Sequence, residues 1–225
     1  MTQNEPYVIT IDGPGGSGKG SLALRIARKL GFHSLDSGAI YRLAALKALQ
    51  AKVDLNDEEA VLAALESFNI RFENGDELSI PFLDDEDVSD QIRLESTGDA
   101  ASIIARHAGV RARLLAWQQQ CLRPPGLVAD GRDMGTVVFP QAKIKFFLYA
   151  SVEIRAQRRH KQLISMGISA NIAQLQTEIA ERDERDSNRA ESPLVPASDA
   201  LVVDSSLLDL DQVTDLMLSH IEDAK

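Results

Sequence analysis

The chain has 225 residues, of which 44% are hydrophobic and 26% charged, and its 24 Lys and Arg against 34 Asp and Glu give a net charge of −10. This length and apolar content suffice for one α/β domain with a sizeable core and exclude a disordered chain. The acidic balance argues against a nucleic-acid polymer as partner, because phosphate backbones need a basic surface. The single cysteine, Cys121, can form neither an internal disulfide nor a metal cluster.

Nothing in the sequence predicts contact with a membrane. No run approaches 18 consecutive apolar residues, so we expect no membrane span. Residues 1–6 are polar and lack a basic n-region, so we expect no signal peptide. Together with the lone cysteine, these features favour a cytoplasmic protein, and we expect a monomer.

A glycine-rich segment follows a predicted buried strand (7–11) and precedes a predicted helix (22–30) that Gly31 should end. The segment reads Gly13-Pro14-Gly15-Gly16-Ser17-Gly18-Lys19-Gly20-Ser21. A strand, a glycine-rich turn and a helix start direct several backbone N–H groups and the positive end of the helix dipole at one anion. Lys19 adds a full charge where the β- and γ-phosphates of a nucleotide would lie.

Two motifs overlap in this segment. Gly13, Gly15 and Gly18 spell the dinucleotide fingerprint G-x-G-x-x-G, and residues 13–19 also spell the P-loop G-x-x-x-x-G-K. The lysine has no role in a nicotinamide site, so we favour the P-loop. Gly20 occupies the position that normally holds a magnesium-binding Ser or Thr, and Ser21 comes one residue late. We therefore expect magnesium to be held largely through water, with Asp130 or Ser21 as candidate ligands.

Residues 32–35 predict a short second strand that leads into a helix. Either Asp36 or Ser37 can cap that helix, which runs on through Leu49. Arg42 lies in its first turns, close after a strand end, where α/β sheets bind ligands. It is either a phosphate contact or a solvated helix arginine, and its position alone favours neither.

Residues 54–106 read as an insertion into the α/β core. Within it we expect a helix over 57–68, a hairpin of strands 70–72 and 78–80 around a turn at 73–76, and a helix over 97–105 that carries Ser102. After the insertion we expect a helix over 110–122 that carries Arg111. The acidic run at 84–90 has the wrong spacing for a calcium loop, so we expect it to be solvated.

A buried strand over 127–129 ends in Asp130-Gly131-Arg132-Asp133. An aspartate after an apolar strand resembles a Walker B acid, and an arginine beside two acids favours a site over a plain Asp-Gly turn. After the next strand, 144–149, Ser151 should cap a helix that Gly167 ends. Its residues Arg155, Arg158, Arg159 and Gln162 share one face, which is either an anion-binding surface or a solvated basic one.

The next helix has an apolar stripe at Ile172, Leu175 and Ile179. The same spacing continues in charged residues, Arg182, Asp186 and Arg189. Buried charges are costly unless they pair or bind something, so the change indicates either a polyanionic ligand or a self-contained Arg–Asp network. Pro193 should end this helix, and a strand over 201–204 and a helix over 210–221 should follow.

Four segments together resemble the bacterial cytidylate (CMP) kinases, a nucleoside monophosphate kinase family of P-loop kinases. They are G-P-G-G-S-G-K-G-S, L-D-S-G-A-I-Y-R, D-G-R-D-M-G-T-V-V-F-P and E-R-D-E-R-D-S-N-R, and the resemblance extends from about Val8 to Ser205. It implies a three-layer α/β P-loop kinase fold with a central parallel sheet flanked by helices. The single domain would have a core (1–53, 107–150 and 171–225), a monophosphate-binding insert (about 54–106) and a lid (about 151–170).

The resemblance implies reversible transfer of the ATP γ-phosphate to CMP or dCMP with Mg²⁺, so that ATP, ADP and the cytidine mono- and diphosphates are the partners. Residues 13–21 would bind ATP, with Arg158 and its neighbours closing over it. On the CMP phosphate, the implied contacts are Arg42 and Arg132, with Ser37 and Tyr41 beside them. The implied contacts of cytosine are Ser102, Arg111 and Asp133. The ribose and the phosphates would be bound by Arg182, Asp186 and Arg189. The implied catalytic residues are Lys19, Arg132, Arg158, Arg182 and Arg189.

Two alternatives remain open from the sequence. One is a P-loop kinase for another acceptor, such as UMP, AMP or a small metabolite. The other is a nucleotide-binding switch that is not an enzyme, although the guanine-binding pattern N-K-x-D of GTPases is absent from the chain.

Overall fold

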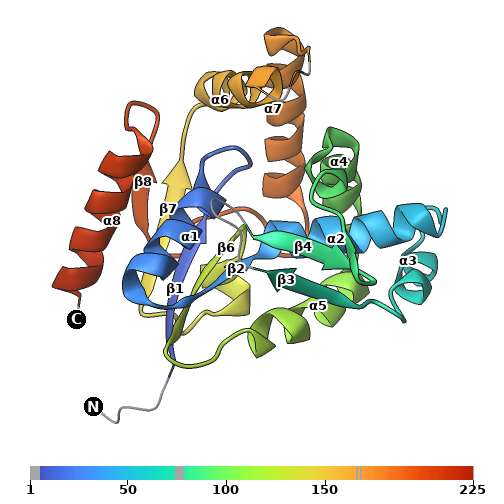
Figure 1. The fold of residues 1–225 in the computed structure, drawn as a ribbon, viewed down its shortest axis with the longest axis horizontal. Coiled ribbons are helices and arrows are strands. Elements are labelled where there is room, and N and C mark those ends of the chain that lie inside the picture. Colours follow the sequence, from blue (N-terminus) through green and yellow to red (C-terminus); the bar gives the residue numbers. More distant parts are fainter. Residues whose placement is uncertain (1–5, 74–78, 166, 168, 225) are drawn as a thin grey trace. The chain divides into compact units, whose positions relative to one another are not determined.

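The computed structural model describes residues 6–73, 79–165, 167 and 169–224 (Figure 1). The chain divides into two compact units. One comprises the described residues of Met1–Leu35 and Leu122–Lys225, and the other is Asp36–Cys121. The division into core, insert and lid stays a prediction.

The first unit is built on a five-stranded sheet with the strand order β2-β6-β1-β7-β8. The strands are β1 (Tyr7–Asp12), β2 (His33–Asp36), β6 (Gly126–Gly131), β7 (Ile144–Tyr149) and β8 (Leu201–Asp204). β1 pairs in parallel with both β6 and β7, and β7 with β8. The predicted parallel sheet and its flanking helices are therefore confirmed.

Two helices, α1 (Lys19–Leu30) and α8 (Leu210–Asp223), supply half of the buried residues in the core cluster of this unit. Both pack their apolar residues, such as Leu22, Ile26 and Met217, into one cluster with the strands of the sheet. Gly31 ends α1 in the left-handed conformation at φ 68°, as predicted.

The strand order places the carboxyl end of β1 at a topological switch point. The chain leaves β1 for β2 and β6 on one side of it, and later crosses to β7 and β8 on the other side. Ligands of open α/β sheets bind at the carboxyl ends of strands where the order reverses in this way. The P-loop begins at this point, directly after Asp12.

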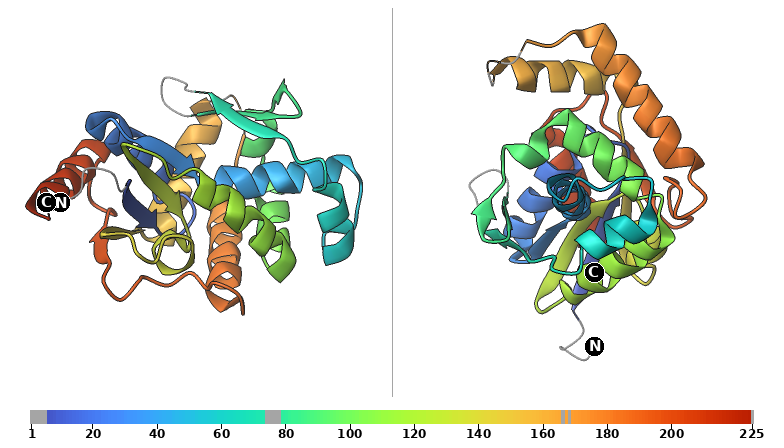
Figure 2. Two further views of the ribbon diagram at one scale, coloured as in Figure 1. Left: turned by 90° about the horizontal axis from the view of Figure 1, so that it is seen from below. Right: turned by 90° about the vertical axis from the view of Figure 1, so that its right-hand side faces the viewer.

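Three further helical elements belong to this unit. They are the π-helical turn η2 (Met134–Val138), α6 (Val152–Ser165) and α7 (Ile172–Asn188). α6 and α7 pack against each other (Figure 2). The predicted inward stripe of α7 is wrong at Ile172, which is 39% exposed because it lies in the first turn, beyond the packed part. Pro193 does not end α7 either, since the backbone of Arg189 is already extended.

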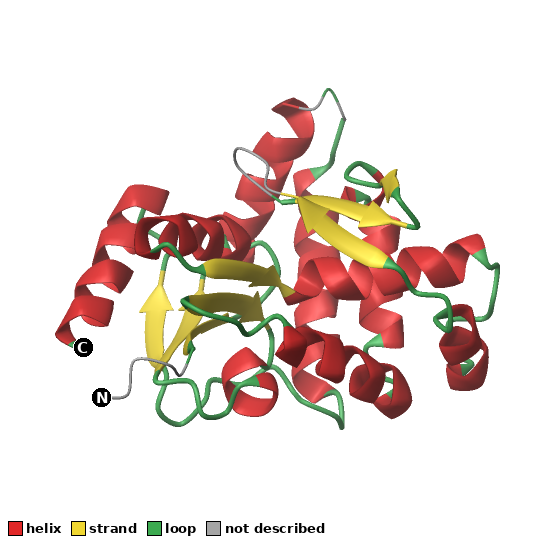
Figure 3. Cartoon of the chain, turned by 60° about the horizontal axis from the view of Figure 1, so that its bottom comes forward, coloured by secondary structure: helices red, strands yellow, loops and turns green. Residues whose placement is uncertain are grey.

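The second unit contains four α-helices, a 3₁₀ turn and a three-stranded antiparallel sheet among its described residues (Figure 3). The helical elements are α2 (Ser37–Gln50), α3 (Glu58–Ala64), η1 (Gln91–Arg93), α4 (Glu95–Ile104) and α5 (Ala108–Gln120), and the strands β3 (Ile70–Glu73), β4 (Ile80–Leu83) and β5 (Glu86–Asp87). The predicted hairpin is present as β3 and β4, but residues 74–76 and 78 lie outside the described residues. α3 is shorter than predicted, and part of the acidic run forms the exposed strand β5 instead of a loop.

No helix in the described parts of the chain is long and apolar enough to cross a membrane.

Candidate active site

The P-loop folds around the carbonyl oxygen of Pro14. Ser17 Oγ donates to that oxygen at 3.0 Å, and Lys19 Nζ donates to it at 2.9 Å. Gly16 and Gly18 have φ values of 77° and 97°, which residues with a Cβ rarely adopt. Lys19 begins α1 and is only 5% exposed, so its charge is held inside the loop at the N-terminus of the helix. This arrangement suits the phosphates of a nucleotide.

Three predicted CMP-binding arginines gather around one carboxylate. Asp186, buried near the end of α7, accepts from Arg132 Nε at 2.8 Å, and its other oxygen lies 4.0 Å from Arg189 Nη1. Burial alone would raise the pKa of Asp186, but the charges of Arg132, Arg182 and Arg189 outweigh it and hold the pKa below its usual range. Burial would lower the pKa of Arg132, but the charges of Asp186, Asp130 and Asp183 and its hydrogen bond to Asp186 outweigh burial and raise that pKa.

These arginines also lie against the P-loop. A Cβ added to Gly15 would lie 3.2 Å from Arg132 Nη2 and 3.9 Å from Arg182 Nε. Within the first unit, the fold therefore brings together the P-loop, the Asp-Gly-Arg-Asp segment after β6 and the charged end of α7. The glycine lets both guanidinium groups approach the loop closely.

A residue that the sequence did not single out, Asp12, positions the segment after β6. Its two carboxylate oxygens accept from the backbone N–H groups of Met134 at 2.8 Å and Gly135 at 2.7 Å. Asp12 thereby fixes the start of η2, directly after Arg132 and Asp133. Asp12 could have been found from the sequence, because it is an acidic residue at the end of an apolar strand. The same pattern had pointed to Asp130.

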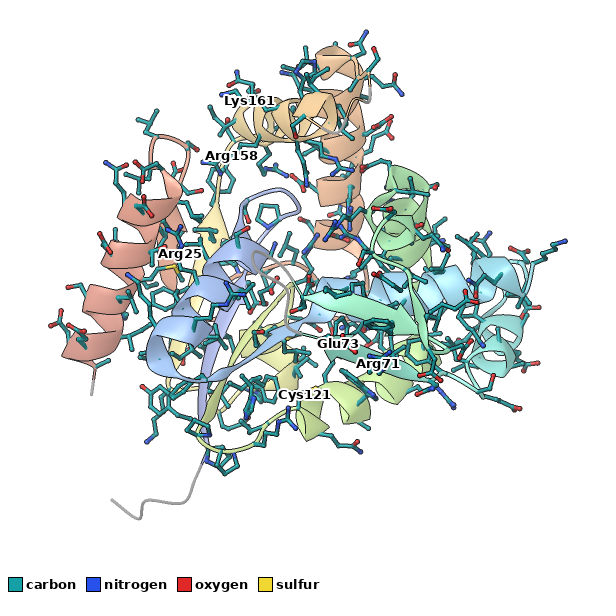
Figure 4. The ribbon with its side chains drawn as sticks, viewed as in Figure 1. Arg25, Arg71, Glu73, Cys121, Arg158 and Lys161 are labelled. Carbon is teal, nitrogen blue, oxygen red and sulfur yellow. The ribbon has the colours of Figure 1, made fainter. Side chains whose placement is uncertain are left out.

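The arginines predicted to share one face of α6 have different surroundings. Arg158, labelled in Figure 4, donates to the carbonyl oxygens of Ser17 at 3.3 Å and Ser205 at 2.6 Å. Arg159 donates to Gln162 on the surface. Arg155 is fully buried and bonded to protein oxygens, so the single anion-binding face is wrong for this residue.

The second unit holds the remaining predicted residues. Asp36 caps α2 by accepting from Ala39 N at 2.8 Å, which places Ser37 and Tyr41 on its first turns, both buried. The Arg111 guanidinium lies 5.7 Å from the centre of the Tyr41 ring, as a cation–π contact.

Two more predicted residues lie in this unit. Ser102 of α4 is 7% exposed, and its hydroxyl has no hydrogen-bond partner among the described residues. A buried hydroxyl of this kind suits a ligand. Arg42 is half-buried on α2.

The residues near the P-loop fit a magnesium ion that is held mostly by water and phosphate. Asp130 is 7% exposed and lies at the carboxyl end of β6. Ser21 is exposed on α1. Among the residues that the structure describes, no three His, Cys, Asp or Glu side chains are grouped to hold a metal. Mg²⁺ commonly keeps several waters and uses one or two carboxylates beside the substrate phosphates.

A P-loop at the switch point of a parallel sheet, faced by arginines from two other segments, defines a P-loop phosphotransferase. A family model described as cytidylate kinase matches residues 9–223. The chain belongs to the cytidylate kinase family.

Curated relatives are similar over almost their whole length. A cytidylate kinase of Burkholderia thailandensis is 53% identical over 223 residues, which cover 97% of this chain and 96% of that protein. A cytidylate kinase of Paraburkholderia phymatum is 54% identical over 208 residues, covering 92% and 90%. Among solved structures, a shikimate kinase from Acinetobacter baumannii is similar with a TM-score of 0.48 and 15% identity, covering 98% of this chain and 95% of that chain.

Asp12 predicts a measurable pH dependence of stability. Burial raises its pKa from 3.8 to about 6, although the two backbone N–H donors lower it. Between these values the native state binds the proton more tightly than the unfolded state, so the contribution of Asp12 to the free energy of unfolding falls as the pH rises. The loss should reach about 3 kcal/mol above pH 6. In Asp12→Asn this loss should be absent.

The measurement is urea unfolding of both proteins at intervals from pH 4 to pH 7.5. We expect the difference in unfolding free energy, wild type minus variant, to decrease through this window. A difference that stays constant with pH would show that Asp12 does not titrate there.

Proposed function

We infer that this chain is an ATP-dependent kinase that transfers the γ-phosphate of ATP reversibly to CMP or dCMP, giving ADP and CDP or dCDP. The observation that carries this function is the approach of Arg132 and Arg182 to Gly15 of the P-loop, within a cytidylate kinase family member. A donor-phosphate loop faced by arginines is what transfer between two phosphates requires.

We assign ATP to the P-loop, residues 13–21, with Lys19 on its β- and γ-phosphates. Arg158 would close over ATP, since it already contacts the Ser17 carbonyl of the loop. Its partners there are neutral oxygens, the carbonyls of Ser17, Ser205 and Leu208 and the Ser205 hydroxyl. A guanidinium among neutral acceptors keeps its charge for an anion.

We assign the CMP phosphates and ribose to Arg132, Arg182, Asp186 and Arg189 in the first unit, and Asp133 to cytosine. In the second unit, Ser37, Tyr41 and Arg42 would contact the phosphate end of CMP, and Ser102 and Arg111 the base. The unpartnered Ser102 hydroxyl and the placement of Arg111 against Tyr41 support these roles.

The acceptor is an anionic phosphate oxygen, so no general base is needed. Lys19 and the arginines align the two phosphates and neutralise the charge that develops on the transferred group. Mg²⁺, held through Asp130 and water, would add further neutralisation when it is bound with ATP. The cytoplasmic location and the monomeric state remain predictions.

An acceptor panel with Mg-ATP tests the function. We expect diphosphate formation from CMP and dCMP, and much less from UMP and AMP. Lys19→Ala should abolish turnover with every acceptor while the fold stays intact, because its charge meets the transferring phosphate. Lys29→Ala, on the exposed side of the same helix, should keep wild-type turnover. Comparable kcat/KM for all four acceptors, or full activity of Lys19→Ala, would contradict the proposal.

Base choice is tested by Asp133 and Arg111 in separate variants. Cytosine offers an exocyclic amine as donor and a ring nitrogen and carbonyl as acceptors, whereas uracil replaces the amine with a carbonyl and protonates the ring nitrogen. Each mismatched buried polar group costs about 1–3 kcal/mol. Asp133→Asn and Arg111→Met should therefore lose CMP efficiency and narrow the CMP/UMP ratio.

The measurement is kcat/KM for CMP and UMP in the wild type and in each variant. If both variants keep the wild-type ratio, cytosine is read by other residues.

A further inference from the structure

Arg155 is the most deeply buried charged side chain among the described residues, with 1% exposure. Its Nε donates to the carbonyl oxygen of Ala150 at 2.9 Å, and one Nη donates to that of Gly15 at 3.0 Å. Both Nη groups also bond the carboxylate of Asp183, as a two-pronged ion pair. Four of the five N–H groups of this guanidinium are thus bonded to oxygens of this protein. Moving it to a nucleotide phosphate would break buried bonds, which is costly.

These bonds join three segments that are far apart in the sequence. Ala150 follows β7, Gly15 is the third residue of the P-loop, and Asp183 lies in α7. A rigid guanidinium with several fixed donors can hold three groups at set distances, which a lysine cannot. Arg155 therefore fixes the P-loop relative to α7.

The same helix carries the arginines of the acceptor side. Asp183 is adjacent to Arg182 and lies one turn before Asp186, which binds Arg132. Gly15 is held by Arg155 through its carbonyl, and its Cα faces Arg132 and Arg182. The Arg155–Asp183 pair thus links the position of the P-loop to the position of the arginines on the acceptor side.

We propose that Arg155 is a positioning residue that sets the register between the ATP-phosphate loop and the CMP-phosphate arginines. Each nucleotide keeps its own contacts when this pair is broken, so each still binds. What is lost is the alignment of the γ-phosphate with the acceptor oxygen, and a displacement of about 1 Å can cost about 10²-fold in rate. The pair therefore acts on kcat and not on either KM.

The test is steady-state kinetics of Asp183→Asn with both substrates varied. This substitution keeps the size of the side chain and the Arg155 bonds to Ala150 and Gly15, but removes the charge and one acceptor. We expect kcat to fall at least 10-fold, with KM for ATP and KM for CMP each within 3-fold of wild type. Arg155→Lys should show the same pattern, and the double variant should cost no more than either single one, because the two residues act as a unit.

Asp211→Asn is the matched control, because it breaks the exposed ion pair with Arg25, labelled in Figure 4, in the same unit. It should leave kcat unchanged. A rise in KM for ATP alone would make Arg155 an ATP ligand and overturn the proposal. A lowered Tm with unchanged kcat would show that the pair only stabilises the fold, and this result would also overturn the proposal. Asp183 is 23% exposed, so Asp183→Asn provides the test even if Arg155→Lys does not fold.

Discussion

The carboxylate of Asp186 is the point on which the phosphate-binding arginines depend. It lies buried near the end of α7 and holds Arg132, from a segment 54 residues earlier, at 2.8 Å. A buried guanidinium without such a partner would be strongly unfavourable. The charges of Arg182 and Arg189 also act on this carboxylate, so Asp186 links all three arginines.

One backbone contact of the P-loop tolerates no side chain, because a Cβ on Gly13 would lie 2.1 Å from the Leu148 carbonyl oxygen. A Cβ on Gly15 would lie 3.2 Å from the side chain of Arg132, which would have to shift slightly. Arg155 holds the Gly15 carbonyl, and Asp12 holds η2 just after the Asp-Gly-Arg-Asp segment. Arg155 and Asp12 thus hold the P-loop and the segment after β6 in place, and the proposed phosphoryl transfer by alignment and charge neutralisation needs such fixed groups.

The secondary structure around the P-loop could be predicted well, because it depends on residues that are close together in the sequence. The P-loop and its flanking strand and helix follow from an apolar run, glycines and a lysine within about 25 residues, whereas the parallel sheet was implied by the family resemblance. The partners of Asp12 and Arg155 could not be predicted from local patterns, because Met134 and Gly15 lie 122 and 140 residues away from them. Helical spacing placed Arg155 with Arg158 and Arg159, but a 14-residue helix buries one side near its start and exposes its far end. Helical spacing likewise predicted a buried Ile172, but this residue lies in the first turn of α7 and is 39% exposed.

The central proposal is that this arginine cluster binds substrate phosphates, beyond the internal ion pairs that its arginines form. Arg182→Gln tests it most directly, with the free energy of unfolding without ligand and kcat/KM for CMP measured on the same protein. Because Arg132 still holds Asp186, we predict a stability within about 0.5 kcal/mol of wild type or higher, with kcat/KM lowered at least 100-fold. A variant destabilised by more than about 1 kcal/mol that keeps near-wild-type kcat/KM would contradict the account.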